Sequence, residues 1–453
     1  MAFIRKVKTK HGTYLAKVES YREKGRVRQR YLRYVGKEIE GKIIRRVSTD
    51  DIKVKSVKQS LDVLAVHKIA KDLELDEFQN KRVIALAYAQ LLGQTSIKKT
   101  DEWLKFTEIP DVLKLDKVSS KNLYDAIEDL QDVDFDKVES KLSEAFGQYE
   151  NSSKAAVVDV TDTYFEGKTL NIKRRRGKDG KVRRLVQIGL AVSPENGFPI
   201  MHKEYNGNLS NIQIFKDMSV SLKERNIKSI IIDRGMLSEE NLDMLLRLNT
   251  DVIGGLKKTK TLVKKFIAPV KRNEIFLLKN MVQLKNTKVY IKSFKYRDGK
   301  IIVVYNPISE IYRKEKNFEK GITKNSLHAG YSLIYHKTDF QEKDIVKKYY
   351  DKEIVERAFK QLKGVLNLRP IRMWLQNNIK SHIKICYLSY AILALMNYRL
   401  KKLGVSGPDA LDSLKHGYKV TLEEKNNHSW SLIVPLEPNQ KKILQKLGVV
   451  YKN

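Results

Sequence analysis

QEKDIVKKYYDKEIVERAFKQLKG, residues 341–364, is the stretch that decides how the rest of the chain is interpreted. Its apolar residues recur at three- and four-residue intervals, which is typical of an amphipathic helix. An α-helix turns about 100° per residue, so on one continuous helix four polar residues share a sector of roughly 60°: Tyr349, Lys352, Glu356 and Lys363. The stretch predicts a helix with one carboxylate among cations, although a solvated face laced by i,i+4 ion pairs has the same pattern.

The charge of the chain indicates a polyanionic partner. The 453 residues include 88 Lys and Arg against 54 Asp and Glu, a formal net charge of +34 with a pI near 9.8. Each phosphate that a basic side chain neutralises releases condensed counterions, so nucleic acid is the leading candidate. A membrane surface is a weaker candidate, because the cations are spread through a mixed globular composition.

Cysteine and histidine usage narrows the metal chemistry. Cys386 is the sole cysteine, which excludes an internal disulfide and a cysteine-based zinc site. The eight histidines show no His-x-x-x-His or comparable spacing. A metal would therefore be held mainly by carboxylate oxygen, which suits Mg²⁺ or Mn²⁺.

Neither the N-terminal residues nor the longest apolar run predicts membrane insertion. MAFIRKVKTKHG lacks the apolar centre of a signal peptide. The longest apolar run, around residues 385–396, is too short to span a bilayer and predicts a buried helix. We therefore expect an intracellular, soluble protein without a membrane partner.

Composition and periodicity predict two to four domains in a chain of this length. The first region is β-rich, basic and interleaved with tyrosine, and the second is helical. Either could bind DNA, but the first could equally be a sheet with a basic outer face and the second a scaffold or dimer contact. The boundaries are 1–50 (basic β-rich), 51–148 (helical), 149–256 (first part of an α/β core), 257–327 (β-rich insertion), 328–400 (second part of the core) and 401–453 (C-terminal region).

Three carboxylates stand out in the α/β core. Asp159 and Asp233 follow apolar strands, 74 residues apart, and Glu356 lies on the helical stretch 123 residues further on. Open α/β sheets place active sites at strand ends. Phosphoryl transfer on DNA needs two divalent ions about 3.5–4 Å apart, which carboxylates can hold. Each aspartate could also be an ordinary strand-end turn residue, and Asp162 rivals Asp159.

The helical stretch resembles a signature of DDE transposases from bacterial and archaeal insertion sequences, in the group marked by Tyr-x2-Arg-x3-Glu-x6-Lys. Here the motif reads Tyr349-x2-Lys352-x3-Glu356-x6-Lys363, with lysine in place of arginine. That exchange weakens bidentate clamping of phosphate, because lysine is a point charge.

Other blocks of the same family occur in order between residues 157 and 400. DVTDTYF resembles the first-Asp block and favours Asp159 over Asp162, and SIIIDRGMLSEENL resembles the block of Asp233. NGFPIMHKEYNGN (196–208) and LNLRPIRMWLQNNIKSHIKICYLSYAIL (366–393) are also similar to the family's sequence.

The resemblance implies an RNase H-like mixed sheet with flanking helices, interrupted by the β-rich insertion and preceded by the N-terminal β and helical regions. It implies that Asp159, Asp233 and Glu356 are catalytic and bind two Mg²⁺ (or Mn²⁺) ions. Trp374 could stack on a displaced base, although a core tryptophan is the simpler interpretation. The DNA-contact candidates are Tyr349, Lys352, Lys363, Arg369, Arg372 and Trp374.

The activity implied is metal-dependent cleavage at the ends of an insertion sequence and transfer of the freed 3′-OH into target DNA. The expected partners are double-stranded DNA, both terminal inverted repeats and target, and a second copy in a paired-end homodimer. The expected location is the cytoplasm, in association with the nucleoid. Two alternatives stay open: an RNase H-like nuclease or resolvase without strand transfer, and a catalytically silent DNA-binding protein derived from a transposase.

Overall fold

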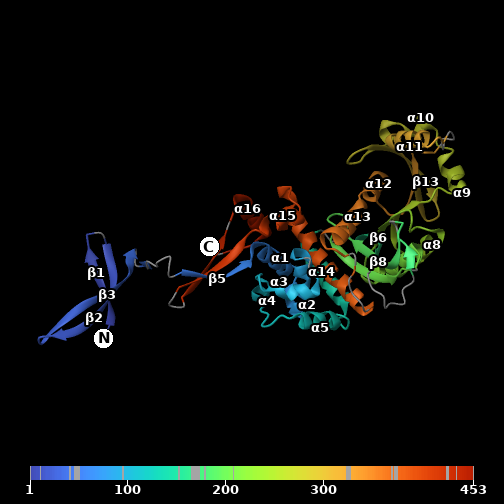
Figure 1. Ribbon diagram of the computed structural model, residues 1–453. Coiled ribbons are helices and arrows are strands. Elements are labelled where there is room, and N and C mark those ends of the chain that lie inside the picture. Colours follow the sequence, from blue (N-terminus) through green and yellow to red (C-terminus); the bar gives the residue numbers. More distant parts are fainter. Residues whose placement is uncertain are drawn as a thin grey trace. The chain divides into compact units, whose positions relative to one another are not determined.

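The computed structural model divides into two compact units (Figure 1). One unit comprises Met1–Lys58, Tyr418–Pro435 and Lys452–Asn453, and the other comprises Gln59–Gly417 and Leu436–Tyr451. The structure describes residues 2–10, 12–39, 42–44, 52–93, 96–150, 154–164, 174–177, 180–207, 209–322, 328–368, 371, 376–424, 428–434 and 436–451.

The first unit contains two sheets. Lys24 and Gly25 both have positive φ, 47° and 79°, as a two-residue hairpin turn requires. The first sheet has the order β1 (Ala2–Thr9), β2 (Gly12–Glu23), β3 (Arg26–Ile39), β4 (Lys42–Ile44). The second has the order β17 (Ser429–Val434), β16 (Tyr418–Glu424), β5 (Ile52–Gln59).

A helical bundle forms one part of the second unit, and α14 (Gln376–Leu400) lies at its centre, in contact with α1, α2, α5, α15 and α16. Ser389 on α14 donates a hydrogen bond to the Ala87 carbonyl, 3.0 Å away. The other helices are α1 (Leu61–Asp72), η2 (Leu75–Glu77), α2 (Lys81–Leu92), α3 (Ile97–Leu104), α4 (Ile109–Leu113), α5 (Ser120–Asp129), α6 (Phe135–Phe146), η6 (Lys401–Leu403), α15 (Gly407–Leu414) and α16 (Pro438–Leu447).

Among the described residues, one helical stretch, Asn377–Leu403, is long and apolar enough to cross a membrane. This helical stretch is longer than the apolar run at residues 385–396, because the helix continues through polar residues on both sides of that run. However, 83% of its most apolar window is buried inside the protein. This is the arrangement of a core helix, as the sequence predicted.

Ten strands of the described chain form one mixed sheet. The order is β12 (Met281–Gln283), β13 (Lys288–Tyr296), β14 (Gly299–Tyr305), β15 (Tyr331–Lys337), β11 (Asp251–Leu256), β10 (Ser229–Ile232), β6 (Ala155–Tyr164), β8 (Val182–Val192), β7 (Arg174–Arg176), with β9 (Pro199–Asn206) also paired to β8. β10 runs parallel to β6 and β11, and the other recorded pairs of this sheet are antiparallel. The fold is therefore mixed α/β.

The region predicted as a β-rich insertion extends this sheet, because β14 pairs with β15. Its remaining elements are α9 (Lys260–Leu262), η3 (Val263–Ile267), α10 (Arg272–Ile275), η4 (Leu278–Asn280) and α11 (Pro307–Glu319). Figure 1 shows these helices together with β13 at one end of the second unit. The boundaries at residues 257 and 327 stay a prediction.

The two faces of the central strands are covered differently. On one face Val158, Ile230 and Ile232 join the apolar core beneath α7 (Asn211–Glu224) and α8 (Glu239–Arg247). Successive side chains of a strand point to opposite faces, so Val157, Asp159 and Ile231 face the other way. α12 (Glu342–Tyr350) contacts β10 and β11, while α13 (Glu353–Lys360) contacts β6 and β8. We assign these two helices to the face that carries Asp159.

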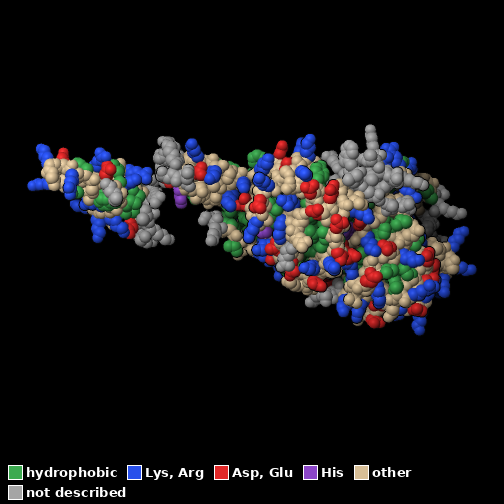
Figure 2. Space-filling model, turned by 90° about the horizontal axis from the view of Figure 1, so that it is seen from below, with side chains coloured by type: hydrophobic (Ala, Val, Ile, Leu, Met, Phe, Trp, Pro, Cys, Tyr) green, Lys and Arg blue, Asp and Glu red, His purple; other side chains and the backbone are tan. Residues whose placement is uncertain are grey.

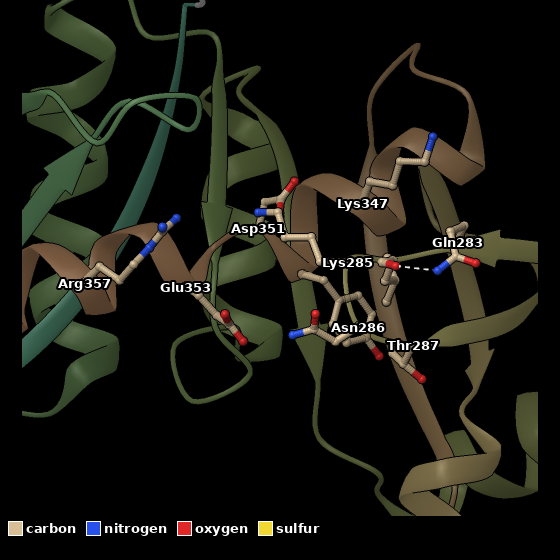
Figure 3. Close-up of a pocket in the computed structure, with 10 residues that line it drawn as sticks. Gln283, Lys285, Asn286, Thr287, Lys347, Asp351, Glu353 and Arg357 are labelled. Carbon is tan, nitrogen blue, oxygen red and sulfur yellow. Dashed lines mark hydrogen bonds and ion pairs between the residues drawn. The ribbon is translucent and has the colours of Figure 1, made fainter. Parts of the chain in front are cut away.

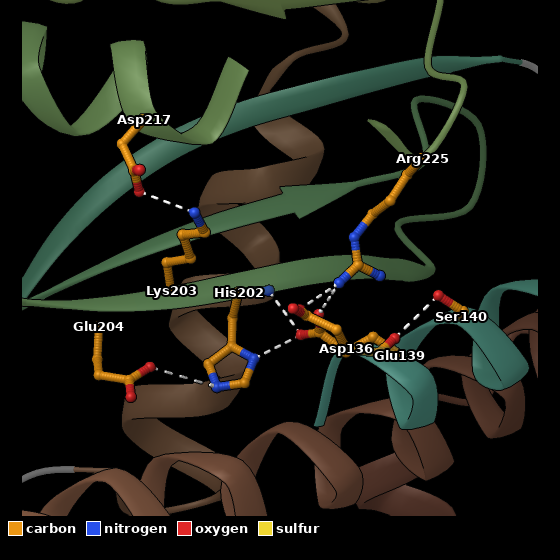
Figure 4. Close-up of polar contacts among 8 residues, drawn as sticks. All are labelled: Asp136, Glu139, Ser140, His202, Lys203, Glu204, Asp217 and Arg225. Carbon is orange, nitrogen blue, oxygen red and sulfur yellow. Dashed lines mark hydrogen bonds and ion pairs between the residues drawn. The ribbon is translucent and has the colours of Figure 1, made fainter. Parts of the chain in front are cut away.

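A buried polar cluster joins the bundle to the edge of the sheet (Figure 4). The Glu139 carboxylate on α6 accepts hydrogen bonds from the backbone N–H of His202 (2.8 Å) and from its ring Nδ1 (2.6 Å). Arg225 pairs with the second oxygen of Glu139 at 2.8 Å and with Asp136 at 2.7 Å. The cluster therefore fixes β9 against α6 with both carboxylate oxygens of Glu139 satisfied.

Candidate active site

Parallel pairing places two of the predicted carboxylates side by side. Ile232 of β10 lies opposite Val158 of β6 in parallel register, so the next residues, Asp233 and Asp159, are at the same level. Neighbouring strands are roughly 4.8 Å apart, and residues at the same level point to the same face. Asp159 is half-buried in β6, where its Oδ1 accepts a hydrogen bond from the Val160 N–H at 2.8 Å. The sheet thus brings Asp159 and Asp233 together on the face opposite α7.

Asp233 already has a cation and a phenol beside it. Lys352 Nζ lies 2.8 Å from Asp233 Oδ1, and the side chains are 17% and 52% exposed respectively. Burial raises the pKa of Asp233, but the hydrogen bond and the charge of Lys352 lower that pKa by more, so it lies below its usual value. Asp233 is therefore a carboxylate kept ionised by its partner and still half open to solvent.

Tyr349 completes this cluster. Burial and then the negative charge of Asp233 raise the pKa of Tyr349, so its hydroxyl stays protonated and donates a hydrogen bond to Asp233. A Cβ at Gly255 on β11 would lie 2.2 Å from the Tyr349 hydroxyl oxygen, so only glycine admits the phenol here. Lys352 Nζ also lies 5.3 Å from the centre of the Tyr349 ring. Tyr349 and Lys352, predicted as DNA contacts, thus both contact Asp233.

The helix predicted over residues 341–364 is interrupted. α12 ends at Tyr350 and α13 begins at Glu353, with a turn at Asp351 and Lys352 between them. The expectation of one continuous helix is therefore wrong at this point. The backbone in this turn forms hydrogen bonds between residues three apart. For example, the Ile354 N–H donates to the Asp351 carbonyl at 3.1 Å. Such a turn is wound more tightly than an α-helix, so the rotation per residue about the helix axis is larger. The positions of Lys352 and Glu356 around the helix axis therefore cannot be related by 100° per residue.

Glu356 lies on the exposed side of α13. In the described part of the chain it has no hydrogen-bond or ion-pair partner. No group of three His, Cys, Asp or Glu among the described residues is arranged to hold a metal ion. The structure therefore juxtaposes the two aspartates and puts the helix of Glu356 over the same sheet, without assembling the three carboxylates into one cage.

The remaining predicted DNA contacts have different outcomes. Lys363, in the π-helical turn η5 (Gln361–Val365), donates a hydrogen bond to the Thr161 hydroxyl, which is two residues from Asp159 on the same strand face. Arg369, Arg372 and Trp374 lie outside the described residues. Lys363 is thus the one of these four that the structure places beside the aspartates.

A cavity of about 360 Å³ next to this helix was not anticipated from the sequence. It lies between the turn at residues 283–287 and the junction of α12 with α13, and Lys285 pairs with Asp351 across it at 2.6 Å. Figure 3 shows Lys347, Glu353 and Arg357 on the helical side. The basic turn Leu284-Lys285-Asn286-Thr287-Lys288 was visible in the sequence, but local pattern does not show which helix a turn will meet.

Comparison with known proteins gives a family. Residues 150–392 match the family described as "Transposase DDE domain". A search of curated proteins found no match. The chain is also similar to a solved structure, the cryo-EM structure of a piggyBac transposase synaptic complex with hairpin DNA, with 10% sequence identity and a TM-score of 0.40, covering 79% of this chain and 70% of that one. Since the family match spans more than half of the 453 residues, the chain belongs to the family of transposases with a DDE domain.

Proposed function

We propose that this transposase cuts DNA at the ends of an insertion sequence and joins the freed 3′-OH to target DNA. The observation that carries the proposal is the parallel register that sets Asp159 beside Asp233, on the face that α13 covers. Membership of the family means that the reaction class is phosphoryl transfer on DNA. The proposed catalytic residues are Asp159, Asp233 and Glu356.

The donor set suits divalent metal, which DDE transposases generally use. Carboxylate oxygens are the ligands that Mg²⁺ and Mn²⁺ prefer, and Asp233 and Glu356 are both accessible to solvent. Two such ions, when bound, would activate the attacking oxygen and stabilise the leaving oxygen. Asp159 and Asp233 would hold them from the sheet and Glu356 from the helix. Tyr349 orients Asp233 through its hydrogen bond.

Several finer features belong to the same proposal. The ten-stranded sheet and its flanking helices would form an RNase H-like core. Within the DDE transposases, the chain would belong to the insertion-sequence group that has the Tyr-Arg-Glu-Lys signature. Lys363, with Arg369, Arg372 and Trp374, would contact DNA near the cut, and the basic N-terminal sheet would help to bind the element's ends. The active form would be a homodimer with two terminal repeats, in the cytoplasm at the nucleoid.

A cleavage and joining assay tests the proposal. The substrate is the labelled DNA that flanks the gene, with Mg²⁺ or with EDTA. We expect the wild type to cut at the element's end and to join the product to a second duplex, with both steps lost in EDTA. Glu356→Gln should lose both steps and keep DNA binding.

Glu353→Gln is the matched control, because Glu353 is also exposed on α13, one turn earlier. It should cut like the wild type. Equal cutting by Glu356→Gln would contradict the assigned active site. Cleavage without joining would favour a nuclease, and tight binding without any cleavage would favour a silent DNA-binding protein.

A further inference from the structure

The edge of the catalytic sheet carries a two-stranded arginine ribbon, defined as the described residues of 174–184. β8 pairs with β6 as far as Leu185 opposite Tyr164 and then continues toward its N-terminus, paired with β7 alone. The pairs are Arg174 with Arg184, Arg175 with Arg183 and Arg176 with Val182. The ribbon therefore extends past the end of β6 that follows Asp159.

The described residues of the arginine ribbon carry charge of one sign. On the face seen in Figure 2, Lys and Arg side chains are interspersed with Asp and Glu. The described part of the ribbon contains no acid, and its cations are Arg174, Arg175, Arg176, Lys181, Arg183 and Arg184. All three residues of β7 are exposed, and no described residue forms an ion pair with Arg174 or Arg176. Clustered, exposed arginines are the electrostatic footprint of a polyanion site.

Strand alternation shows which arginines share a face with the catalytic aspartates. Asp159 lies opposite Leu190, and Arg184 is six residues from Leu190 on the same strand, so both point to the same face. Arg174 lies across from Arg184, and Arg176 is two residues further along. The face that carries Asp159 thus continues into a row formed by Arg184, Arg174 and Arg176.

The opposite face of the ribbon is held by the protein. The Arg183 guanidinium lies 4.0 Å from the centre of the Tyr164 ring. Arg175 donates a hydrogen bond to the Gly207 carbonyl at 3.4 Å. One face of the ribbon therefore anchors it to the sheet, and the other presents arginines on the side of the carboxylates.

We infer that the arginine ribbon binds the phosphate backbone of duplex DNA beside the cleavage site, an inference that rests on the proposed function. Arginine matches phosphate geometry with paired donors. At 3.4 Å per residue, Arg184 and Arg176 lie roughly 20 and 27 Å along β8 from the level of Asp159. This corresponds to about six to eight base pairs of B-DNA. The ribbon positions the duplex without reading its sequence, because phosphate contacts fix register and carry no base information.

A salt titration of DNA binding tests the inference on the full chain, without divalent metal. The probe is the labelled flanking duplex, and the readout is the slope of log K against log salt. Each lost phosphate contact reduces that slope by about 0.9, so Arg174→Gln/Arg176→Gln should reduce it by about 1.8. The single variant Arg176→Gln should reduce it by about half as much. Its matched control is Arg175→Gln, which removes the same charge from the anchored face and should leave the slope unchanged.

An unchanged slope in the double variant overturns the inference, as does an equal reduction in Arg175→Gln. Thermal unfolding of the Arg174 and Arg176 variants should match the wild type, because these side chains are exposed and lie on the face that is not anchored. Binding is measured without chemistry, so the two proposals fail separately. If the double variant lowers the slope but the wild type does not cleave DNA, the inference about the ribbon stands and the transposition proposal is rejected. If the wild type cleaves and joins DNA but the slope is unchanged in the double variant, only the inference about the ribbon is rejected.

Disulfide cross-linking locates the contact. Cys386 is the sole cysteine and is buried, and burial raises the pKa of its thiol, so an added thiol is the reactive one. Arg176→Cys is combined with DNA that carries a tethered thiol at successive positions of the flank. We expect cross-linking to peak about six to eight base pairs from the mapped cut. Even cross-linking along the whole flank would contradict the placement.

Discussion

The Glu139 cluster and the Asp233 cluster both hold one carboxylate with a cation and a second donor, yet they differ in burial. The Glu139 side chain is 2% exposed and its partner Arg225 is 15% exposed. The Asp233 side chain is 52% exposed, although its partner Lys352 is only 17% exposed. In the first cluster both oxygens of the carboxylate are occupied by protein donors, whereas in the second the carboxylate still reaches solvent.

The difference in burial agrees with a structural role for Glu139 and with the catalytic role proposed for Asp233. A buried charge that loses its partner costs several kcal/mol, so the Glu139 cluster has to stay closed. An exposed pair contributes about 1 kcal/mol or less, so a ligand of higher charge can compete with Lys352 for Asp233. The two clusters should therefore respond in opposite ways to substitution, with stability changing in one and activity in the other.

The largest expected effect is on catalysis at the open cluster. Asp233→Asn should lower the cleavage rate by a factor on the order of 10³, about 4 kcal/mol of activation free energy, because it removes a proposed metal ligand. Its free energy of unfolding should stay within about 1 kcal/mol of the wild type, since that is the most that so exposed an ion pair contributes. Single-turnover cleavage and urea unfolding measure the two quantities. Wild-type cutting by this variant would remove Asp233 from the site.

The next effect is on stability at the closed cluster. Glu139→Gln should lower the free energy of unfolding by about 3 kcal/mol, because it breaks the buried ion pair and leaves Arg225 with only the exposed Asp136 as counterion. Urea denaturation measures the loss. Glu144→Gln is the control, since Glu144 is exposed on the same helix. A loss below about 1 kcal/mol would show that the Glu139 cluster is no more than a surface pair.

Metal binding at the open cluster should change less, and in the favourable direction. Lys352→Gln removes the cation that competes for Asp233, so we expect Mn²⁺ to bind more tightly in the absence of DNA, by up to about tenfold. Lys352→Arg should restore the competition. Calorimetric titration of the full chain measures the affinity. Equal or weaker binding by Lys352→Gln would mean that Lys352 does not occupy the metal position.

The smallest effect is a pH dependence of stability at the open cluster. Lys352 holds the pKa of Asp233 below its usual value despite partial burial, so the pair stabilises the fold above the unfolded pKa of aspartate, about 3.9. That contribution, no more than about 1 kcal/mol for so exposed a carboxylate, is lost as the pH falls through the folded pKa. Lys352→Gln should thus be less stable than the wild type near neutral pH and equal to it in strong acid. A difference that persists in strong acid would need another cause.

The sequence predicted the elements that carry the site. Asp233 directly follows β10 as predicted, and Glu356 is on a helix. The expectation that Asp159 follows its strand is wrong, because β6 continues past it to Tyr164. Such elements follow from local hydrophobic periodicity and from the residues that end strands. The same holds for β1 to β3, where alternation and the turn at Lys24 and Gly25 are local signals.

The contacts that define the site could not be predicted in that way. The register of β10 on β6 joins residues some seventy positions apart, and the extension of the sheet by β14 joins elements of two predicted regions. The turn between α12 and α13 interrupts an apolar pattern that continues through it, so periodicity gave no sign of it. The basic run that forms the arginine ribbon was visible in the sequence. Which of its arginines share the face of Asp159 depends on the register of β7 on β8, which local pattern does not give.

The central position of α14 has a consequence for the synthesis of the chain. α2 packs on α14, although the two helices are separated by about 300 residues of sequence. At translation rates of about 5–20 residues per second, α2 waits roughly 15–60 s for its packing partner to leave the ribosome. During that time its apolar side is open to chaperones and to other nascent chains. A chain truncated before residue 376 would therefore yield an aggregation-prone product, because α2 would lack the helix on which it packs.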